Sequence, residues 1–352
     1  MTPPRSILIV SVAMIAALVV CAFLWHNWRP ASAVLKPASP AIPTTTPVND
    51  DDSAPTTLWA HNIRLRKGPH FRVYILWIRG EMLRINPRIV PSLDAPESFI
   101  FNIRQGVIHA NIGDLAAYLN AVSLPDAPLK QITVQPDGER LRVHGLLKKI
   151  VPLPVEIVGG LSPLPDGDVR FHIEKISLLK IPMKGLLGAL RIQVSDIVGA
   201  TRIPGIQISD NDIIFDTSIL LPPPHIRGQI TSIHIDPPDV EVVYGNAHND
   251  EVKLAQWHNF LRLSGGTINF GKFTMHQADL TMIDVGNHPW FGLDLSNYQA
   301  QLTRGYARIT PASGIEAYMP DMDERNPATA PPPVTIDTLR NRNNSIPGKI
   351  QK

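Results

Sequence analysis

Cysteine is nearly missing from this chain of 352 residues, and the one cysteine, Cys21, lies in an apolar run near the N-terminus. The rest of the chain therefore has no thiol pair for a disulfide and no thiolate set for a metal ion. A chain of this length can bury enough apolar surface to fold without such links. We expect its hydrophobic core to hold the fold together.

The sequence also lacks the short motifs of common enzyme classes. It contains no G-x-S-x-G, no H-E-x-x-H and no phosphate-binding glycine loop. Its formal net charge is only +2, which gives no overall attraction toward nucleic acid. We therefore expect a protein that is not an enzyme, needs no cofactor and has no nucleic-acid partner.

No charged residue, proline or glycine interrupts the apolar run at residues 7–25. At about 1.5 Å per residue, a helix of this length covers a hydrocarbon core of roughly 30 Å. Trp25 and Trp28 stand at its end, where aromatic rings favour the headgroup layer. We expect residues 1–29 to be a single-pass membrane anchor, with the bulk of the chain extracytoplasmic, either periplasmic or at the cell surface.

Two alternatives exist for this run. Ala31-Ser32-Ala33 has the form of a signal-peptide cleavage site, although the apolar run exceeds the usual signal core of about 15 residues. Lipid attachment at Cys21 is disfavoured, because that residue follows Val20 and further apolar residues come after it. An anchor and a cleaved signal place the following chain in the same compartment.

Proline recurs through residues 30–57, together with a threonine run and three consecutive aspartates. Such a segment stays extended and solvated, which predicts a linker that holds the folded part away from the bilayer. A β-rich domain is expected over 58–245, and 246–320 is expected to be a second β/α part or a continuation of the same domain. Residues 321–352 have no apolar face, so they are expected to be disordered.

Short apolar runs separated by turn residues fill the folded region. Strands at 71–78 and 82–90 are expected to form a hairpin around Arg79-Gly80-Glu81. Further strands are expected at 99–112, 131–135, 141–148, 150–161, 168–179, 206–209, 212–221, 225–235, 240–244, 267–270, 272–284 and 315–319. Helices are expected after Asn111, at 182–198, from Asn249 or Asp250 to 261, and at 295–306, with Ser296 as a cap.

This order of elements excludes a regular βαβ alternation. It predicts an α+β fold in which the N-terminal transmembrane helix is followed by a predominantly antiparallel, curved β-sheet domain. A few short helices are expected to pack on one side of that sheet.

Two clusters of acidic or histidine residues are candidates for a reactive or metal site. The first consists of Asp210, Asp212 and Asp216. The second consists of His276, Asp279, Asp284 and His288. The first supplies too few oxygen ligands for Ca²⁺, and the second has no matching ligands on another element. We therefore expect no catalytic residue and no metal site, and a hydrolase using the region of His276 and Asp279 is a distant alternative.

Basic residues are concentrated between residues 64 and 88, where Glu81 is the one acidic residue. A solvated strand face is the simpler interpretation. The alternative is contact with anionic lipid headgroups, to which each basic residue near the surface adds about 1 kcal/mol. The candidates for headgroup contact are Arg64, Arg66, Lys67, Arg72, Arg84 and Arg88.

Two segments, 150–161 and 176–187, present apolar side chains in both directions. A core strand covered on both faces has this pattern. A curved sheet that lines an apolar groove has it too, with Gly159 and Gly160 permitting close approach, and an acyl chain of a lipid would fit such a groove. The candidate groove residues are Val155, Ile157, Leu161, Ile176, Leu178, Leu187, Leu190 and Val194.

Two stretches carry a resemblance to a known family. They are Gly106-Val-Ile-His-Ala-Asn-Ile-Gly-Asp-Leu-Ala-Ala-Tyr-Leu-Asn120, and Gly185-Leu-Leu-Gly-Ala-Leu190 followed by Ile203-Pro-Gly-Ile-Gln-Ile-Ser-Asp210. Through them, residues 99–236 resemble LmeA-type lipid-binding envelope proteins. The resemblance implies a tubular or curved α+β lipid-binding fold at the cell envelope.

We therefore expect a membrane-anchored extracytoplasmic protein that binds or shuttles lipid, or supports envelope assembly, through an apolar groove. Its expected partners are the membrane, through the N-terminal helix, a lipid ligand and an envelope protein. The alternative is a non-enzymatic scaffold that binds a protein partner at the cell envelope.

Overall fold

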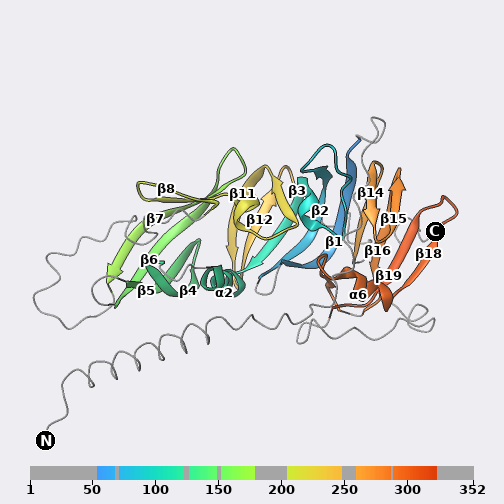
Figure 1. Ribbon diagram of the computed structural model, residues 1–352. Helices are drawn as coiled ribbons and strands as arrows, with labels where there is room; N and C mark the ends of the chain where they lie inside the picture. The colour runs from blue at the N-terminus through green and yellow to red at the C-terminus, as the bar shows by residue number, and fades with distance from the viewer. Residues whose placement is uncertain are drawn as a thin grey trace, which may run out of the picture. The chain divides into compact units, whose positions relative to one another are not determined.

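The computed structural model describes residues 54–67, 71–122, 127–148, 152–178, 204–247, 259–286 and 288–322, which belong to one compact unit. They form mainly strands with a few short helices (Figure 1), which confirms the expected β-rich composition. No helix among these residues has the length and hydropathy to cross a bilayer. The expected anchor, most of the linker, the helix at 182–198 and the tail after residue 322 lie outside the described residues.

The larger of the two main sheets has eleven strands. Its main path runs in the order β11 (Ile230–Asp236), β12 (Asp239–Tyr244), β3 (Phe99–Asn111), β2 (Phe71–Arg84), β1 (Thr56–Lys67), β13 (Phe260–Ser264), β16 (Asp279–Asp284), β19 (Ile315–Met319) and β18 (Tyr306–Ile309). Off this path, β10 (His225–Gly228) pairs with β3 and β17 (Phe291–Leu293) pairs with β1, both in parallel. Because β13 pairs with β1, the strands β13, β16, β19 and β18 extend the same sheet.

The smaller main sheet has six strands and is antiparallel throughout. Its order is β4 (Leu129–Asp137), β5 (Arg140–Lys148), β6 (Pro152–Pro163), β7 (Val169–Leu178), β9 (Asp212–Phe215) and β8 (Ile206–Ser209). The expected turns after β4 and β6 are confirmed, with Gly138 and Gly167 in the left-handed region that glycine adopts without steric cost. A separate hairpin joins β14 (Thr267–Phe270) and β15 (Phe273–His276).

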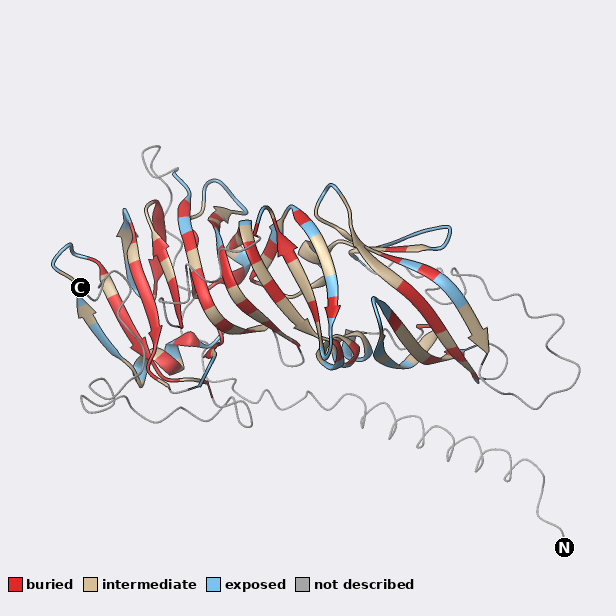
Figure 2. Ribbon diagram, turned by 180° about the vertical axis from the view of Figure 1, so that it is seen from behind, coloured by how far each residue is buried: buried red, intermediate tan, exposed pale blue. Residues whose placement is uncertain are grey.

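Buried and less buried residues alternate along the strands, as Figure 2 shows. In β2, for example, Phe71, Val73 and Ile75 are buried, whereas Arg72 and Tyr74 between them are partly exposed. This is the burial pattern of a strand with one face on the core. The buried face of the larger sheet forms the main hydrophobic cluster, and a second cluster joins the smaller sheet to β11, β12 and α2 (Ile112–Val122).

The expected hairpin turn at Arg79-Gly80-Glu81 is wrong, because these residues lie inside the continuous strand β2. The pairing of β2 with β3 shifts register between Arg79 and Gly80. A Cβ on Gly80 would lie 2.2 Å from the backbone oxygen of Asn102 on β3. The glycine therefore permits close approach at a β-bulge rather than a reversal of the chain.

The helix expected after Asn111 is confirmed as α2, and the Asn111 side chain accepts the N–H groups of Gly113 and Asp114 at 3.0 and 3.2 Å. The helix expected at 295–306 is the shorter α6 (Tyr298–Thr303), and its N-cap position is Asn297 instead of Ser296. The helix expected to reach residue 261 is wrong at its end, since β13 begins at Phe260.

Three expected strands are interrupted in the structure. The strand at 212–221 stops after β9, because Asp216 caps the short helix α4 (Thr217–Leu220) by accepting the N–H groups of Ser218 and Ile219. The strand at 225–235 is divided into β10 and β11, and that at 272–284 into β15 and β16.

Candidate functional site: an apolar cavity between the two sheets

A cavity of about 320 Å³ lies between the larger sheet, the smaller sheet and α2. Its volume falls within the range of roughly 300–1,000 Å³ that small-molecule sites occupy. Every side chain in its wall is aliphatic, aromatic or proline except that of Thr217. The site can therefore hold a hydrocarbon group but offers little to a polar ligand.

The larger sheet supplies one wall from strands that are neighbours in space. Val73 of β2, Ala110 of β3 and Val240 of β12 are successive cross-strand partners, so their side chains share one face. All three line the cavity. Tyr244 of β12 also lines it, and burial raises the pKa of its hydroxyl, which stays protonated.

The smaller sheet supplies the opposite wall, with Leu141 on β5, Ile157 and Leu161 on β6, Phe171 on β7 and Ile213 on β9. The β6–β7 ladder shifts register between Val158 and Gly159. A Cβ on Gly159 would lie 2.3 Å from the backbone oxygen of His172. This glycine therefore lets β7 approach β6 closely at a bulge, a device that bends a strand.

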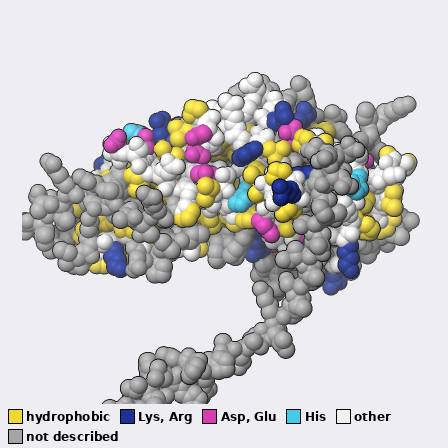
Figure 3. Space-filling view, turned by 45° about the horizontal axis from the view of Figure 1, so that its top comes forward, with side chains coloured by type: hydrophobic (Ala, Val, Ile, Leu, Met, Phe, Trp, Pro, Cys, Tyr) yellow, Lys and Arg dark blue, Asp and Glu magenta, His cyan; other side chains and the backbone are white. Residues whose placement is uncertain are grey.

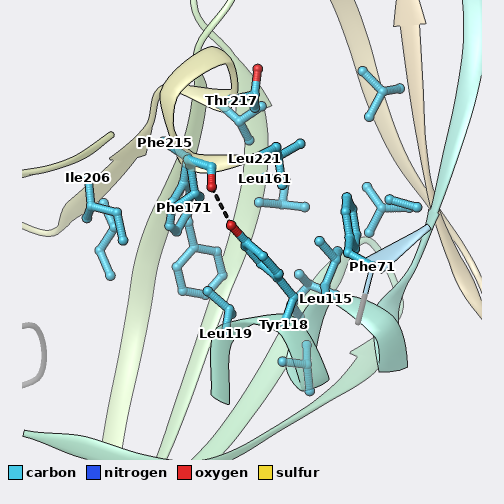
Figure 4. Close-up of a pocket in the computed structure, with 18 of the residues that line it drawn as sticks. Phe71, Leu115, Tyr118, Leu119, Leu161, Phe171, Ile206, Phe215, Thr217 and Leu221 are labelled. Atoms are coloured by element: carbon cyan, nitrogen blue, oxygen red, sulfur yellow. Dashed lines mark hydrogen bonds between the residues drawn. The ribbon is translucent and has the colours of Figure 1, made fainter. Parts of the chain in front are cut away.

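One face of α2 lines the cavity between the sheets, as Figure 4 shows for Leu115, Tyr118 and Leu119. The Tyr118 hydroxyl donates a hydrogen bond to the backbone oxygen of Leu220, 2.5 Å away, and its ring lies 5.6 Å from that of Phe71. Burial raises the pKa of Tyr118, so its hydroxyl remains a donor. This contact joins α2 to the segment that includes α4.

An ion pair also holds α2 against the larger sheet. Nε of Arg72 on β2 lies 3.0 Å from a carboxylate oxygen of Asp114 in the first turn of α2. The pair is partly exposed, so we expect it to fix the orientation of the helix more than to stabilise the fold.

The candidate groove residues are only partly brought together. Ile157 and Leu161 line the cavity. Val155 is fully buried in a separate cluster, against which Leu178 packs, and Ile176 packs against the cluster that the smaller sheet shares with α2 without lining the cavity. The other three candidates, Leu187, Leu190 and Val194, lie outside the described residues.

The wall residues of the larger sheet and of α2 were missed by sequence reasoning as parts of the site. The shared face of Leu115 and Leu119 was visible as helical spacing, but it indicated burial and not a cavity. The contribution of Ala110 depends on the pairing of β3 with both β2 and β12, which brings together segments distant in sequence.

The basic candidates for headgroup contact have different environments. Arg72 pairs with Asp114, and Nη1 of Arg84 donates to the backbone oxygen of Pro87 at 3.5 Å. Arg64 and Arg66 are partly buried, whereas Arg88 is exposed. Lys67 is 0% exposed and its ammonium donates to the backbone oxygen of Pro224, so it does not reach the surface.

The described surface carries both signs of charge. On the described part of the face in Figure 3, basic and acidic side chains are interspersed. One basic–acidic contact is that of Arg104 with Glu81, at 2.7 Å.

The acidic and histidine clusters have structural partners. Asp212 accepts a hydrogen bond from His172 at 2.6 Å, Asp279 pairs with Arg262 at 3.2 Å, and Asp284 accepts one from Asn259 at 3.0 Å. Within the described residues, no group of three histidine, cysteine or acidic side chains is placed to hold a metal ion.

Comparisons of the chain with protein-family models, with curated proteins and with solved structures found no match. A functional assignment therefore depends on the chemistry of the cavity and on the sequence.

Proposed function

We propose that this chain is a non-enzymatic lipid-binding protein and that a hydrocarbon tail of its ligand occupies the cavity between the two sheets. The observation that carries the proposal is an apolar space of about 320 Å³ whose wall contains a single aliphatic hydroxyl, that of Thr217, and two tyrosines. A tail needs no hydrogen-bond partners, and this wall provides almost none.

The energetics of apolar burial favour a hydrocarbon ligand at this wall. Each methylene group transferred from water into such a space gains about 0.8 kcal/mol. The gain for a bound tail would therefore increase with its length.

The chemistry of the wall favours binding over catalysis. Burial raises the pKa of both tyrosines in the wall, Tyr118 and Tyr244, so neither is activated as a nucleophile or base. Thr217 has no histidine or carboxylate partner among the other lining residues.

Two sequence features support a role at a membrane. The apolar run at 7–25 and the proline-rich segment after it would tether the cavity close to a bilayer, from which lipid could enter. The stretch that resembles LmeA-type proteins also supplies part of the wall, namely Ile108, Ala110, Leu115, Tyr118 and Leu119. We therefore propose an anchored extracytoplasmic protein that binds or shuttles lipid, or supports envelope assembly.

The direct test is photolabelling of the full chain with a lipid probe. The chain would be purified from membranes, exchanged into an amphipathic polymer so that no detergent competes, and incubated with a single-chain lipid that bears a photoreactive diazirine in its tail. Labelling of peptides that contain Ile157 or Leu161 supports the proposal. Labelling confined to the apolar run at 7–25 contradicts it.

A scaffold function is the second candidate, and an exposed sheet edge favours it. β18 is the last strand of the larger sheet and carries Tyr306 and Ile309, which are 47% and 78% exposed. A strand of a partner protein could add to such an edge through backbone hydrogen bonds. A photoreactive amino acid at Ile309 should then give one dominant protein adduct in cells, and a diffuse set of adducts would count against this function.

A further inference from the structure

Lys67 is the last residue of β1 and its whole side chain is buried. The burial follows from strand geometry, because Ile63, Leu65 and Lys67 alternate onto the same interior face. Its one described hydrogen bond runs from the ammonium to the backbone oxygen of Pro224. A lysine carries three N–H donors, so this contact leaves most of its capacity unused.

A buried ammonium group without an anionic partner is unfavourable. Taking the charge out of water costs several kcal/mol unless a counter-charge compensates for it. Among the described residues, no carboxylate forms an ion pair with Lys67, and burial lowers its pKa to about 7. The group is therefore close to balance between the neutral and charged forms, and a nearby anion would favour the charged form.

His225, the residue after Pro224, adds a second polar group without a full set of partners. Its Nδ1 atom is buried and has no hydrogen-bond partner. Burial, and then the nearby charge of Lys67, lower the pKa of His225, whereas hydrogen bonds of its ring to the backbone at Ser218 and Leu221 act in the opposite direction. The unpartnered polar atom of this ring is therefore Nδ1. The other charge that acts on this ring is Asp216, whose carboxylate is held by the N–H groups at the start of α4.

Both groups lie beside the apolar cavity. Phe71, the direct cross-strand partner of Lys67, belongs to the cavity wall. On the other side, the hydrogen-bonded oxygen of Pro224 lies between Leu221 and Ile226 in sequence, and both of these line the wall. Lys67 and His225 do not line the cavity themselves, but each adjoins residues of its wall.

We propose that Lys67 and His225 form the head-group site of this cavity, and that its ligand is a single-chain carboxylic acid. The carboxylate would accept a hydrogen bond from Nζ of Lys67 beside the His225 ring, while the hydrocarbon tail fills the apolar space. This inference rests on the proposed lipid-binding function and specifies its ligand class.

The size and chemistry of the site favour a fatty acid over a phospholipid. The volume of about 320 Å³ is near the lower end for ligand sites, which suits one chain better than two. A carboxylate is compact and carries one charge, which matches a single buried ammonium. A phosphodiester head with its attached groups would need more donors and more room than Lys67 and His225 provide.

The test compares two photoreactive probes that share a hexadecyl diazirine tail and differ only in the head, which is a carboxylic acid in one and an alcohol in the other. Full-length chain in an amphipathic polymer is labelled over a range of probe concentrations, and labelled peptides from the cavity wall are quantified. We expect wild type to prefer the acid by at least about tenfold, corresponding to about 1.4 kcal/mol. Lys67→Met should remove that preference and leave labelling by the alcohol unchanged.

Lys67→Arg is the matched control, because its guanidinium keeps a positive charge where the lysine ammonium stood. We expect this variant to retain a preference for the acid. Equal labelling by acid and alcohol in wild type, or a preference that survives in Lys67→Met, overturns the head-group assignment while leaving lipid binding intact. Stronger labelling by a phosphatidylglycerol probe than by the acid overturns it too. If neither probe labels the wall, the proposed function itself fails.

If the variants fail to fold, a measurement on wild type alone tests whether Lys67 binds the carboxylate. The preference for the acid requires a charged Lys67, so it should decline as the pH is raised from about 7 toward 10.5, the ordinary value for lysine. The alcohol probe should show no such decline over the same range. A preference that is constant over this range rules out Lys67 as the partner of the carboxylate.

Discussion

Ala110→Phe is the substitution that tests most directly whether the cavity holds the ligand. Ala110 lies on β3 between Val73 and Val240, its cross-strand partners, and all three line the cavity. A phenyl ring at this position would project from the shared face into the space. The perturbation therefore fills the cavity without removing any contact that the wall now makes.

The expected loss of affinity follows from the displaced tail. A phenyl ring takes the place of roughly four methylene groups, each worth about 0.8 kcal/mol when buried, so binding should weaken by about 3 kcal/mol. This is a loss of roughly 100-fold in affinity. The stability of the ligand-free chain should change little, because burial of the ring offsets the strain of about 1–3 kcal/mol that overpacking causes.

The assay is the concentration dependence of labelling by the diazirine alcohol probe, with peptides of the cavity wall quantified. Ala307→Phe is the matched control, since Ala307 lies on the exposed edge strand β18, and it should bind the probe as wild type does. A denaturant titration checks that both variants are folded. Wild-type labelling in a folded Ala110→Phe variant would refute the placement of the tail in this cavity.

Three further predictions concern the fold and its charges. Gln301 is buried and makes three hydrogen bonds to backbone groups. Each unsatisfied buried group costs about 1–3 kcal/mol, so Gln301→Met should cost at least about 3 kcal/mol in denaturant unfolding. Gly80→Ala should destabilise the fold more than Gly138→Ala, because a Cβ at Gly80 would clash with a backbone oxygen and a Cβ at Gly138 would meet no atom within 4 Å. Thermal unfolding of the two variants checks which loses more stability. The pKa of Lys67 is about 7 in the folded chain and 10.5 ordinarily, so between these pH values the unfolded state binds more protons and stability should rise with pH. Lys67→Met should flatten that rise in denaturant titrations at several pH values. An unchanged slope would contradict the burial of Lys67.

Local sequence signals predicted local structure well in this chain. The turns at Gly138 and Gly167, the cap at Asn111 and the strand at 315–319 depend on neighbouring residues only, and all four are confirmed. The two clearest errors concern residues whose type suggested one local structure and whose contacts produce another. Gly80 resembled a turn residue, but it is needed for the approach of Asn102 on another strand. Asp216 resembled a strand residue, but its side chain starts a helix.

The cavity could not be predicted at the same level, because its walls come from segments that pair across the fold. An apolar strand has the same sequence pattern whether it faces a packed core or an open space. Val155 and Ile157 are two residues apart and on the same face of β6, yet Val155 is in a filled cluster and Ile157 lines the cavity. Only the position of α2 and the two sheets distinguishes them.

Lys67 shows why the polar end of the site is harder still to predict. In the sequence it belongs to a basic stretch, and a lysine at the end of a strand is almost always solvated. Here the alternation of β1 turns it inward, and its neighbour across the strand, Phe71, belongs to the cavity wall. Evolution of an apolar core alone would favour methionine or leucine at this position, because either would fill the space without the cost of desolvating an amine. A buried lysine beside an apolar cavity is therefore better explained by an anionic group that it binds than by the stability of the fold.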